Sequence, residues 1–276
     1  MTRRGFVYSV VGASAAAVSY PCYLEPRWLD VTENRVKLGG IALSQPVRVL
    51  HLSDLHASFE VPLSLVDRAI TLGLEQKPDL VCLTGDYISR RSPIDSSAYV
   101  RALRRLSAAA PSFAVMENHD GGIWAEQRRG YSDHRFVDRI LEESGIELLH
   151  NRSMRVQVRD ASLSLVGVGD VWSGEIDTRA FAELHPKAPV VLLSHNPDSK
   201  DVLGRFQWDL MLSGHTHGGQ VIIPFQGPSY APVIDKRYVA GLKAWGSRQI
   251  HVTRGVGNLA GVRFRCRPEV SVLVVG

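Results

Sequence analysis

The chain has 276 residues, of which 45% are hydrophobic and 22% charged, and its formal net charge is +4. These values are ordinary for a soluble globular protein, and the scattered basic residues exclude a nucleic-acid-binding arm. Three widely spaced cysteines exclude a disulfide framework. We therefore expect one large domain or two small ones, with no nucleic-acid partner and no obligate protein partner.

Residues 1–22 are typical of an export signal or a membrane anchor. Arg3 and Arg4 precede a weakly apolar run at residues 5–20, which is shorter than the ~20 residues that usually cross a bilayer. A basic start followed by a short apolar run is typical of a secretory signal, and the adjacent arginines resemble a twin-arginine signal. We expect an exported or membrane-associated protein on the periplasmic side of the inner membrane, in preference to a cytoplasmic one. Cleavage of the signal and its retention as an anchor both stay open.

After a lead-in at residues 23–45, apolar β-type runs alternate with helical patterns. This order is the signature of an α/β fold, and we expect one domain over residues 46–276. The many strands of the second half favour two sheets packed face to face with helices outside. The expected elements are a strand at 47–52, a helix at 63–76, a strand at 80–84, a helix at 97–109, a strand at 113–116, a helix at 133–144, a hairpin at 155–158 and 163–168, and strands at 190–194, 209–212, 220–223, 249–253 and 270–275.

Polar side chains follow five of these strands at the point where each strand ends. In α/β sheets, ligands bind outside the carboxyl ends of the strands, so we expect these side chains to meet at one rim. Asp and His are ligands for Zn, Mn and Fe. The residues are Asp54 and His56 after the first strand, Asp86 after the second, Asn118, His119 and Asp120 after the third, His195 after the strand at 190–194, and His215 and His217 after the strand at 209–212.

These residue types suit a pair of divalent ions that hydrolyses a phosphate ester. Two ions ~3.5–4 Å apart hold the attacking and leaving oxygens of an in-line displacement, and a carboxylate can bridge them. A water held between them loses a proton near neutral pH and becomes the nucleophile. The positive charge also offsets the negative charge that builds on the phosphoryl oxygens.

Each segment has a structural explanation when it is taken alone. Asp54 and His56 fit a strand-end cap and a surface histidine, Gly85-Asp86 fits a turn, and residues 195–198 fit a helix N-terminus. Residues 214–220 (GHTHGGQ) are harder to explain in this way, because flanking glycines let two histidines approach one point. The presence of all five segments, each after a buried strand, favours the metal centre.

The other histidines and the nearby tryptophans carry weaker signals. His51 lies inside a strand and is expected to be structural. Trp124 and Trp172 lie in loops near the motifs, where packing in the core or at the rim is expected at least as much as lining a substrate site. The remaining histidines are expected on the surface or in loops: His134, His150, His185 and His251.

Taken together, the segments resemble the calcineurin-like metallophosphoesterases over about residues 47–275, and within that family a subgroup of bacterial phosphodiesterases. The resemblance implies a four-layer α/β/β/α sandwich of two mixed sheets flanked by helices. It implies that Asp86 bridges two divalent ions, with Mn favoured over Fe and Zn, and that the substrate is a phosphate diester. It also implies that His119 stabilises the transition state or protonates the leaving group, and that Asp120 orients His119. The implied ligands of one ion are Asp54, His56, Asp86 and His217, and those of the other are Asp86, Asn118, His195 and His215.

One position departs from the pattern of the family. Glu117 stands where the family has a glycine before Asn118. If that position needs a positive φ, the glutamate is strained by about 1 kcal/mol or more. Its carboxylate could crowd the site, add a ligand or repel a phosphate. We expect Glu117→Gly to keep or raise phosphodiesterase activity.

Two other functions stay open. One is a pyrophosphatase that acts on a lipid-linked precursor such as UDP-diacylglucosamine, as some proteins of the family do. The other is a non-catalytic metal-binding protein, if Glu117 disables the site. The presence of every other expected ligand argues against the second.

Overall fold

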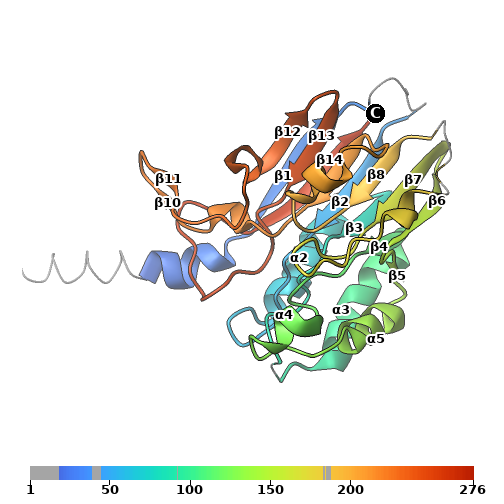
Figure 1. Ribbon diagram of the computed structural model, residues 1–276. Helices are drawn as coiled ribbons and strands as arrows, with labels where there is room; N and C mark the ends of the chain where they lie inside the picture. Colours follow the sequence, from blue (N-terminus) through green and yellow to red (C-terminus); the bar gives the residue numbers. More distant parts are fainter. Residues whose placement is uncertain (1–18, 39–44, 92, 183, 185–187) are drawn as a thin grey trace, which may run out of the picture.

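Two six-stranded sheets pack face to face, with helices on their outer faces (Figure 1). The computed structural model describes residues 19–38, 45–91, 93–182, 184 and 188–276. The signal predicted for residues 1–22 therefore lies outside the described residues except for its last four. Within the described part, no helix is both long and apolar enough to cross a membrane.

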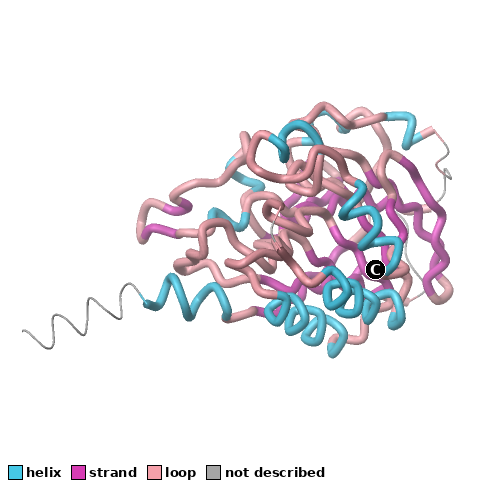
Figure 2. The backbone as a smooth tube through the Cα atoms, turned by 90° about the horizontal axis from the view of Figure 1, so that it is seen from below, coloured by secondary structure: helices cyan, strands magenta, loops and turns pink. Residues whose placement is uncertain are grey.

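The first sheet carries the three longest helices on its outer face, and Figure 2 shows helices running along that side of the strands. Its strands β2 to β5 are parallel, and β14 joins β1 in parallel and β2 in antiparallel orientation. The strand order is β1 (Asp30–Val36), β14 (Glu269–Val275), β2 (Val47–Leu52), β3 (Leu80–Leu83), β4 (Ser112–Ala114) and β5 (Glu147–Leu148). The helices are α2 (Leu63–Glu75), α3 (Ser96–Ala109) and α5 (Arg135–Glu143).

The second sheet is covered by short helices and loops on its outer face. It is parallel from β13 to β7 and has an antiparallel strand at each edge. The strand order is β12 (Gly241–Trp245), β13 (Arg248–Val252), β9 (Leu210–Ser213), β8 (Val190–Leu193), β7 (Ala161–Gly167) and β6 (Arg152–Val158). The short helices are η3 (Thr178–Phe181), α6 (Ser199–Leu203) and η5 (Lys236–Tyr238), and α4 (Gly122–Glu126) lies in the loop after β4.

The alternation of side chains along β2 shows how the sequence builds these layers. Leu50 and Leu52 belong to the cluster between the first sheet and its helices, whereas Val47 and Val49 belong to the cluster between the two sheets. Neighbouring residues of a strand point to opposite faces, so an apolar run without alternation requires burial on both faces. The predicted four-layer arrangement is confirmed, although the helices of the second outer layer are short.

Two details differ from the sequence-based expectation, and the prediction for a third residue cannot be compared. The lead-in contributes β1, an edge strand of the first sheet that its mixed composition did not predict. Only Ile222–Ile223 of the strand expected at 220–223 forms, as β10, which pairs with β11 (Gly227–Pro228) in a separate hairpin. His185 lies outside the described residues.

His251 was expected on the surface or in a loop, and this prediction is wrong. It lies in β13 and is fully buried, and its Nδ1 is 3.0 Å from Nδ1 of His51 on β2. Nε2 of His51 is 2.9 Å from the Thr84 hydroxyl. The two rings form a hydrogen-bonded link between the sheets. The residues around His251 in the sequence could not reveal this link, because its partner lies 200 residues away.

Candidate metal centre

The structure brings all nine predicted site residues together at the ends of β2, β3, β4, β8 and β9. Each segment leaves its strand within a few residues of the carboxyl end, as the sequence predicted. Eight of the nine side chains are buried, and His119 is partly exposed. The strand ends therefore supply a compact polar cluster inside an apolar frame.

Four ligand atoms form the first half of this cluster. Those of Asp54, His56, Asp86 and His217 all lie within 4.8 Å of one another. Nε2 of His56 is 3.1 Å from Nε2 of His217 and 3.2 Å from Oδ2 of Asp86. Nε2 of His217 is 3.3 Å from Oδ1 of Asp54. Two imidazole nitrogens and two carboxylate oxygens thus converge on one point, which is a ligand set for a divalent transition metal.

The second half of the cluster lies on the other side of Asp86. Nε2 of His195 is 3.3 Å from Oδ2 of Asp86, so this carboxylate faces both halves. Nδ1 of His195 is 2.5 Å from the carbonyl oxygen of Thr84, which fixes the ring with Nε2 toward the centre. The ligand atoms of His195 and His215 lie within 4.8 Å of a carboxylate oxygen of Glu117. Asn118 is buried beside them.

The backbone at these positions adopts an uncommon conformation. A positive φ is unusual for residues other than glycine and costs free energy, so it persists where the surrounding structure enforces it, often at functional sites. Five of the predicted ligands have a φ between 47° and 70°: Asp54, His56, Asp86, His215 and His217. The strand ends therefore hold these side chains in position at a cost in backbone strain.

Burial and mutual charge shift the pKa values of the cluster. Burial opposes the charged form of Asp86, but the imidazole of His195 and two further histidines outweigh it and hold the pKa of Asp86 well below its usual value. Burial likewise opposes protonation of His195, but the carboxylates of Asp86 and Asp54 raise its pKa to about 9. Burial, together with the charge of His195, lowers the pKa of His215 to about 3. Asp86 is thus a carboxylate and His215 is neutral, as metal ligands must be, whereas His195 is protonated without a metal and releases its proton on binding one.

Buried polar atoms without hydrogen-bond partners gather in this cluster. A buried polar atom normally has a partner, so each exception needs an explanation. Those near the centre are Asp86 Oδ1, Glu117 Oε1, Asn118 Oδ1 and Nδ2, His195 Nε2 and His215 Nε2. Divalent ions bound here would satisfy most of them at once, so the residues present fit a pair of metal ions.

His119 and Asp120 differ in their contacts from what the family resemblance implied. Nδ1 of His119 is 3.0 Å from the carbonyl oxygen of Ser89, which holds the ring. The carboxylate of Asp120 instead accepts hydrogen bonds from the backbone N–H groups of Asp86, Tyr87 and Glu117, at 2.7 to 3.0 Å. Asp120 therefore positions the loop that carries Asp86, and the prediction that it orients His119 is wrong. A side chain that caps backbone amides across two loops cannot be recognised from local sequence.

Glu117 is buried and points into the second half of the cluster. Its φ is not positive, so the backbone strain considered for this position does not arise. One carboxylate oxygen accepts a short hydrogen bond from the N–H of Asn118. Burial and the adjacent carboxylate of Asp170 raise the pKa of Glu117 well above its usual value. Asp170 was missed in the sequence, although it follows the apolar run of β7 in the same strand-end pattern as the predicted ligands.

Several pockets lie on the described surface, of which one adjoins the cluster and another is separate from it. The first has a volume of about 410 Å³ and is lined by His119, Arg128 and Asn258, among others. Trp124 packs against His119 with ring centroids 4.6 Å apart, and Trp172 packs in the same way against His215 at 4.3 Å. Both tryptophans thus lie at the edge of the metal centre.

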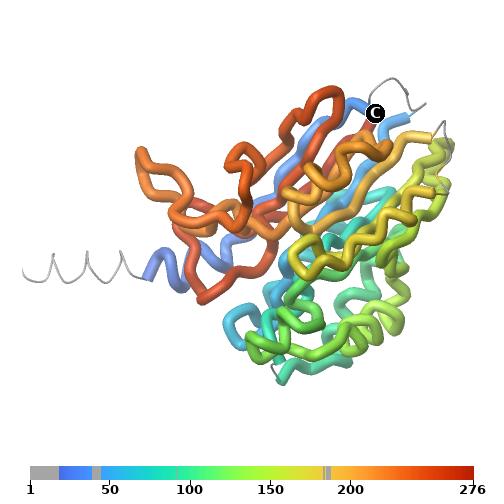
Figure 3. Tube along the Cα trace, viewed as in Figure 1, coloured from blue at the N-terminus to red at the C-terminus, as the bar shows by residue number. Residues whose placement is uncertain are grey.

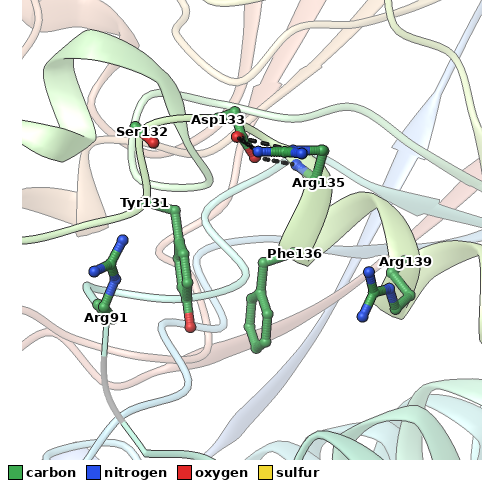
Figure 4. Close-up of a pocket in the computed structure, with 7 residues that line it drawn as sticks. All are labelled: Arg91, Tyr131, Ser132, Asp133, Arg135, Phe136 and Arg139. Carbon is green, nitrogen blue, oxygen red and sulfur yellow. Dashed lines mark hydrogen bonds and ion pairs between the residues drawn. The ribbon is translucent and has the colours of Figure 1, made fainter.

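The second pocket is separate from the cluster (Figure 4). It has a volume of about 280 Å³ and is lined by Arg91, Tyr131 and Phe136, together with further arginines. The guanidinium group of Arg91 lies 5.1 Å from the centre of the Tyr131 ring, and Arg135 pairs with Asp133. None of the predicted site residues lines it, so it is not part of the candidate centre.

The calcineurin-like phosphoesterase family profile matches residues 47–219. The chain belongs to this family. It is 41% identical to phosphodiesterase YaeI of Escherichia coli (strain K12) over 275 residues, which cover 99% of this chain and 98% of the relative. It is 30% identical to the uncharacterized metallophosphoesterase YkuE of Bacillus subtilis (strain 168), over 100% and 98% of the two chains. The chain is thus a metallophosphoesterase, a hydrolase of phosphoric esters.

Two further similarities, to a more distant relative and to a solved structure, are weaker. The UDP-2,3-diacylglucosamine pyrophosphatase LpxG of Chlamydia muridarum (strain MoPn / Nigg) is 26% identical, over 96% of this chain and 94% of its own. The sulfate thiohydrolase SoxB of Thermus thermophilus superposes with a TM-score of 0.50 at 15% identity, over 85% of this chain and 57% of its own. At that identity, the superposition supports the fold alone.

Proposed function

We propose that this metallophosphoesterase is a phosphodiesterase that uses two divalent ions, with Mn favoured. The observation that carries the proposal is the convergence of Asp54, His56, Asp86 and His217, whose ligand atoms lie within 4.8 Å of one another. When bound, the two ions supply an activated water and positive charge against the phosphoryl oxygens. The 41% identity to a phosphodiesterase over nearly the whole chain supports a diester substrate.

The residues of the chain divide this work among them. Asp54, His56 and His217 would hold the first ion, Asn118, His195 and His215 would hold the second, and Asp86 would contact both. Their carboxylate and imidazole atoms already face one another within hydrogen-bond distance. The carbonyl oxygen of Thr84 behind His195 fixes the orientation of that ring, which limits the reorganisation needed for binding there.

His119 is placed to exchange a proton with the departing group. Because Nδ1 faces the Ser89 carbonyl, Nε2 is the nitrogen left for proton transfer. Burial lowers the pKa of His119 below the ordinary value for histidine. The side chain borders the pocket of about 410 Å³ that Arg128 also lines, so an anionic ester can approach it there.

The test is hydrolysis of bis-p-nitrophenyl phosphate and p-nitrophenyl phosphate by purified protein, first metal-stripped and then supplied with Mn²⁺. We expect diester cleavage that Mn²⁺ restores, that exceeds monoester cleavage, and that Asp86→Asn abolishes. Glu126→Gln, on the exposed face of α4, is the charge-matched control and should remain active. Folded protein that cleaves neither substrate with Mn²⁺, Fe²⁺ or Zn²⁺ would reject the proposal in favour of a metal-binding protein.

A second candidate substrate is a lipid-linked pyrophosphate such as UDP-2,3-diacylglucosamine. The 26% identity to LpxG over 96% of this chain favours it, and Leu259 and Ala260 add apolar surface to the pocket beside His119. Release of UMP from this substrate, with a kcat/KM above that for the simple diester, would select this function. The same metal centre would serve both reactions.

We also propose that the protein acts at a membrane surface after export. The basic and apolar start of the chain supports this location. Support also comes from exposed apolar side chains at one end of the molecule: Tyr23 and Leu24 in η1 (Tyr20–Leu24), and Ile223 and Phe225 in the β10–β11 hairpin. η1 and the hairpin lie at the same end of the molecule (Figure 3). Residues 263–264 connect them, because the N–H of Arg263 donates to the carbonyl of Pro21 and the N–H of Ile222 donates to the carbonyl of Phe264.

Cell fractionation tests this location. Wild-type protein should appear in the periplasmic or membrane fraction, and replacement of Arg3 and Arg4 by Lys should retain it in the cytoplasm, since a twin-arginine signal needs both arginines. Cytoplasmic wild-type protein would contradict the proposal without affecting the assignment of the metal centre.

A further inference from the structure

Glu117 is the one acidic side chain of the cluster to which the family pattern gives no role. It is 1% exposed and lies in the loop after β4. One of its carboxylate oxygens, Oε1, has no hydrogen-bond partner in the described structure, while the other accepts from the N–H of Asn118. A buried carboxylate of this kind is unfavourable unless a cation or a donor satisfies it.

The position of Glu117 places its carboxylate beside the second half of the centre. A carboxylate oxygen and the ring nitrogens of His195 and His215 lie within 4.8 Å of one another. The imidazole Nε2 atoms of both histidines also lack hydrogen-bond partners. Three residues from three different loops, each with an unpartnered polar atom, therefore place ligand atoms close together.

Gly85 makes room for this arrangement. A Cβ atom on Gly85 would lie 2.9 Å from Cβ of Glu117 and 3.2 Å from Nδ1 of His195. Glu117 therefore packs directly against the glycine that precedes Asp86, and only a residue without a side chain fits there. Burial and the hydrogen bond from the Asn118 N–H hold the carboxylate at the centre rather than in solvent.

We propose that Glu117 is a carboxylate ligand of the second divalent ion, together with Asn118, His195, His215 and the bridging Asp86. This inference rests on the proposed two-metal function and extends it. Oxygen ligands suit Mn, whereas Zn typically occupies four-coordinate sites rich in nitrogen and sulfur ligands. A carboxylate ligand from Glu117 therefore also favours Mn over Zn. Glu117→Gly would open a coordination position at this ion.

A competing arrangement is a carboxyl pair in which Glu117 shares a proton with Asp170, whose side chain lies next to it. The two arrangements give opposite results for Glu117→Gln. A glutamine amide can donate a hydrogen bond to Asp170 in place of the shared proton, whereas it is a much weaker metal ligand than a carboxylate.

The test is calorimetric titration of metal-stripped full-length protein with Mn²⁺. Wild-type protein should bind two ions. Glu117→Gln and Glu117→Gly should weaken one of the two binding steps by roughly 10–100-fold or more and leave the other unchanged. Competition with Zn²⁺ should shift in favour of Zn²⁺ in both variants. The control Glu126→Gln removes an exposed charge and should bind as the wild type does.

Two outcomes would overturn the inference, and they are distinguishable. Wild-type affinity at both steps in Glu117→Gln, which preserves the shape of the side chain, would assign Glu117 to the carboxyl pair with Asp170. Fewer than two Mn²⁺ ions bound to wild-type protein would reject the two-metal function itself. Thermal unfolding of each variant identifies any loss of fold, and Glu117→Gln alone decides the question if Glu117→Gly does not fold.

Discussion

Gly214→Ala should damage the metal centre through a single methyl group. Gly214 does not have a positive φ, so alanine adds no backbone strain. Its Cβ atom would nevertheless lie 2.1 Å from Oγ of Ser53 and 2.2 Å from Oδ2 of Asp54. Ordinary contact distances require the Asp54 carboxylate to move by about 1 Å, which exceeds the ~0.5 Å within which a metal or catalytic constellation works.

The expected consequence is a loss of metal affinity that is larger than the loss of stability. Overpacking of this kind costs about 1–3 kcal/mol of the free energy of unfolding, while displacement of a ligand should weaken Mn²⁺ binding at the Asp54 ion by roughly 10–100-fold. Calorimetric titration and urea unfolding measure the two effects.

Gly73→Ala is the matched control for this variant. Its Cβ atom would lie 2.7 Å from the end of the flexible Leu50 side chain, far from the metal ligands. It should alter stability without altering Mn²⁺ affinity. If Gly214→Ala binds two Mn²⁺ ions with wild-type affinity, Asp54 is not held as described, and the reasoning is refuted.

Two further predictions concern the polar groups around the centre. Burial lowers the pKa of His251 to about 4. Between pH 6.5 and 4, the unfolded chain therefore binds a proton at this residue that the folded protein excludes. The free energy of unfolding of metal-free protein should fall by up to about 3 kcal/mol as the pH drops through this range. Urea unfolding at several pH values should show a smaller dependence in His251→Gln, and an unchanged slope would contradict the buried link to His51. Asp120→Ala removes the acceptor of three buried backbone N–H groups and should lower the free energy of unfolding by about 1–3 kcal/mol. Mn²⁺ binding should also weaken, because the loop that carries Asp86 loosens. Unaltered urea unfolding would contradict this role.

The sequence predicted most of the sheet core and nearly all of the centre, because both depend on local patterns. Apolar runs such as Leu80–Leu83 mark strands buried on both faces, and an acidic or histidine residue directly after such a run marks a strand end. The same pattern places His217, in the loop after β9, beside His56, in the loop after β2. The carboxyl ends of parallel strands lie at one edge of a sheet, so the position of each ligand follows from the order of the strands in the chain.

What the sequence did not predict depends on contacts between distant segments. β1 in the lead-in shows no strong apolar run and becomes a strand because it adds to the edge of β14. His251 is buried because His51 faces it from the other sheet. Asp120 caps amides across the loop after β3 instead of contacting its neighbour His119. Each of these requires the tertiary structure, since no periodicity within one segment encodes it.

The proposed function requires two ions that act together as one catalytic unit. The most direct test measures metal occupancy and hydrolysis rate in the same titration. Metal-stripped protein is supplied with Mn²⁺ in steps, and the bound ions per chain and the rate of bis-p-nitrophenyl phosphate hydrolysis are measured at each step. We predict that hydrolysis appears only as the second ion binds, and that Asp86→Asn, which lacks the carboxylate facing both halves of the cluster, shows neither full occupancy nor activity. Full activity at one ion per chain, or none at two, would contradict the account.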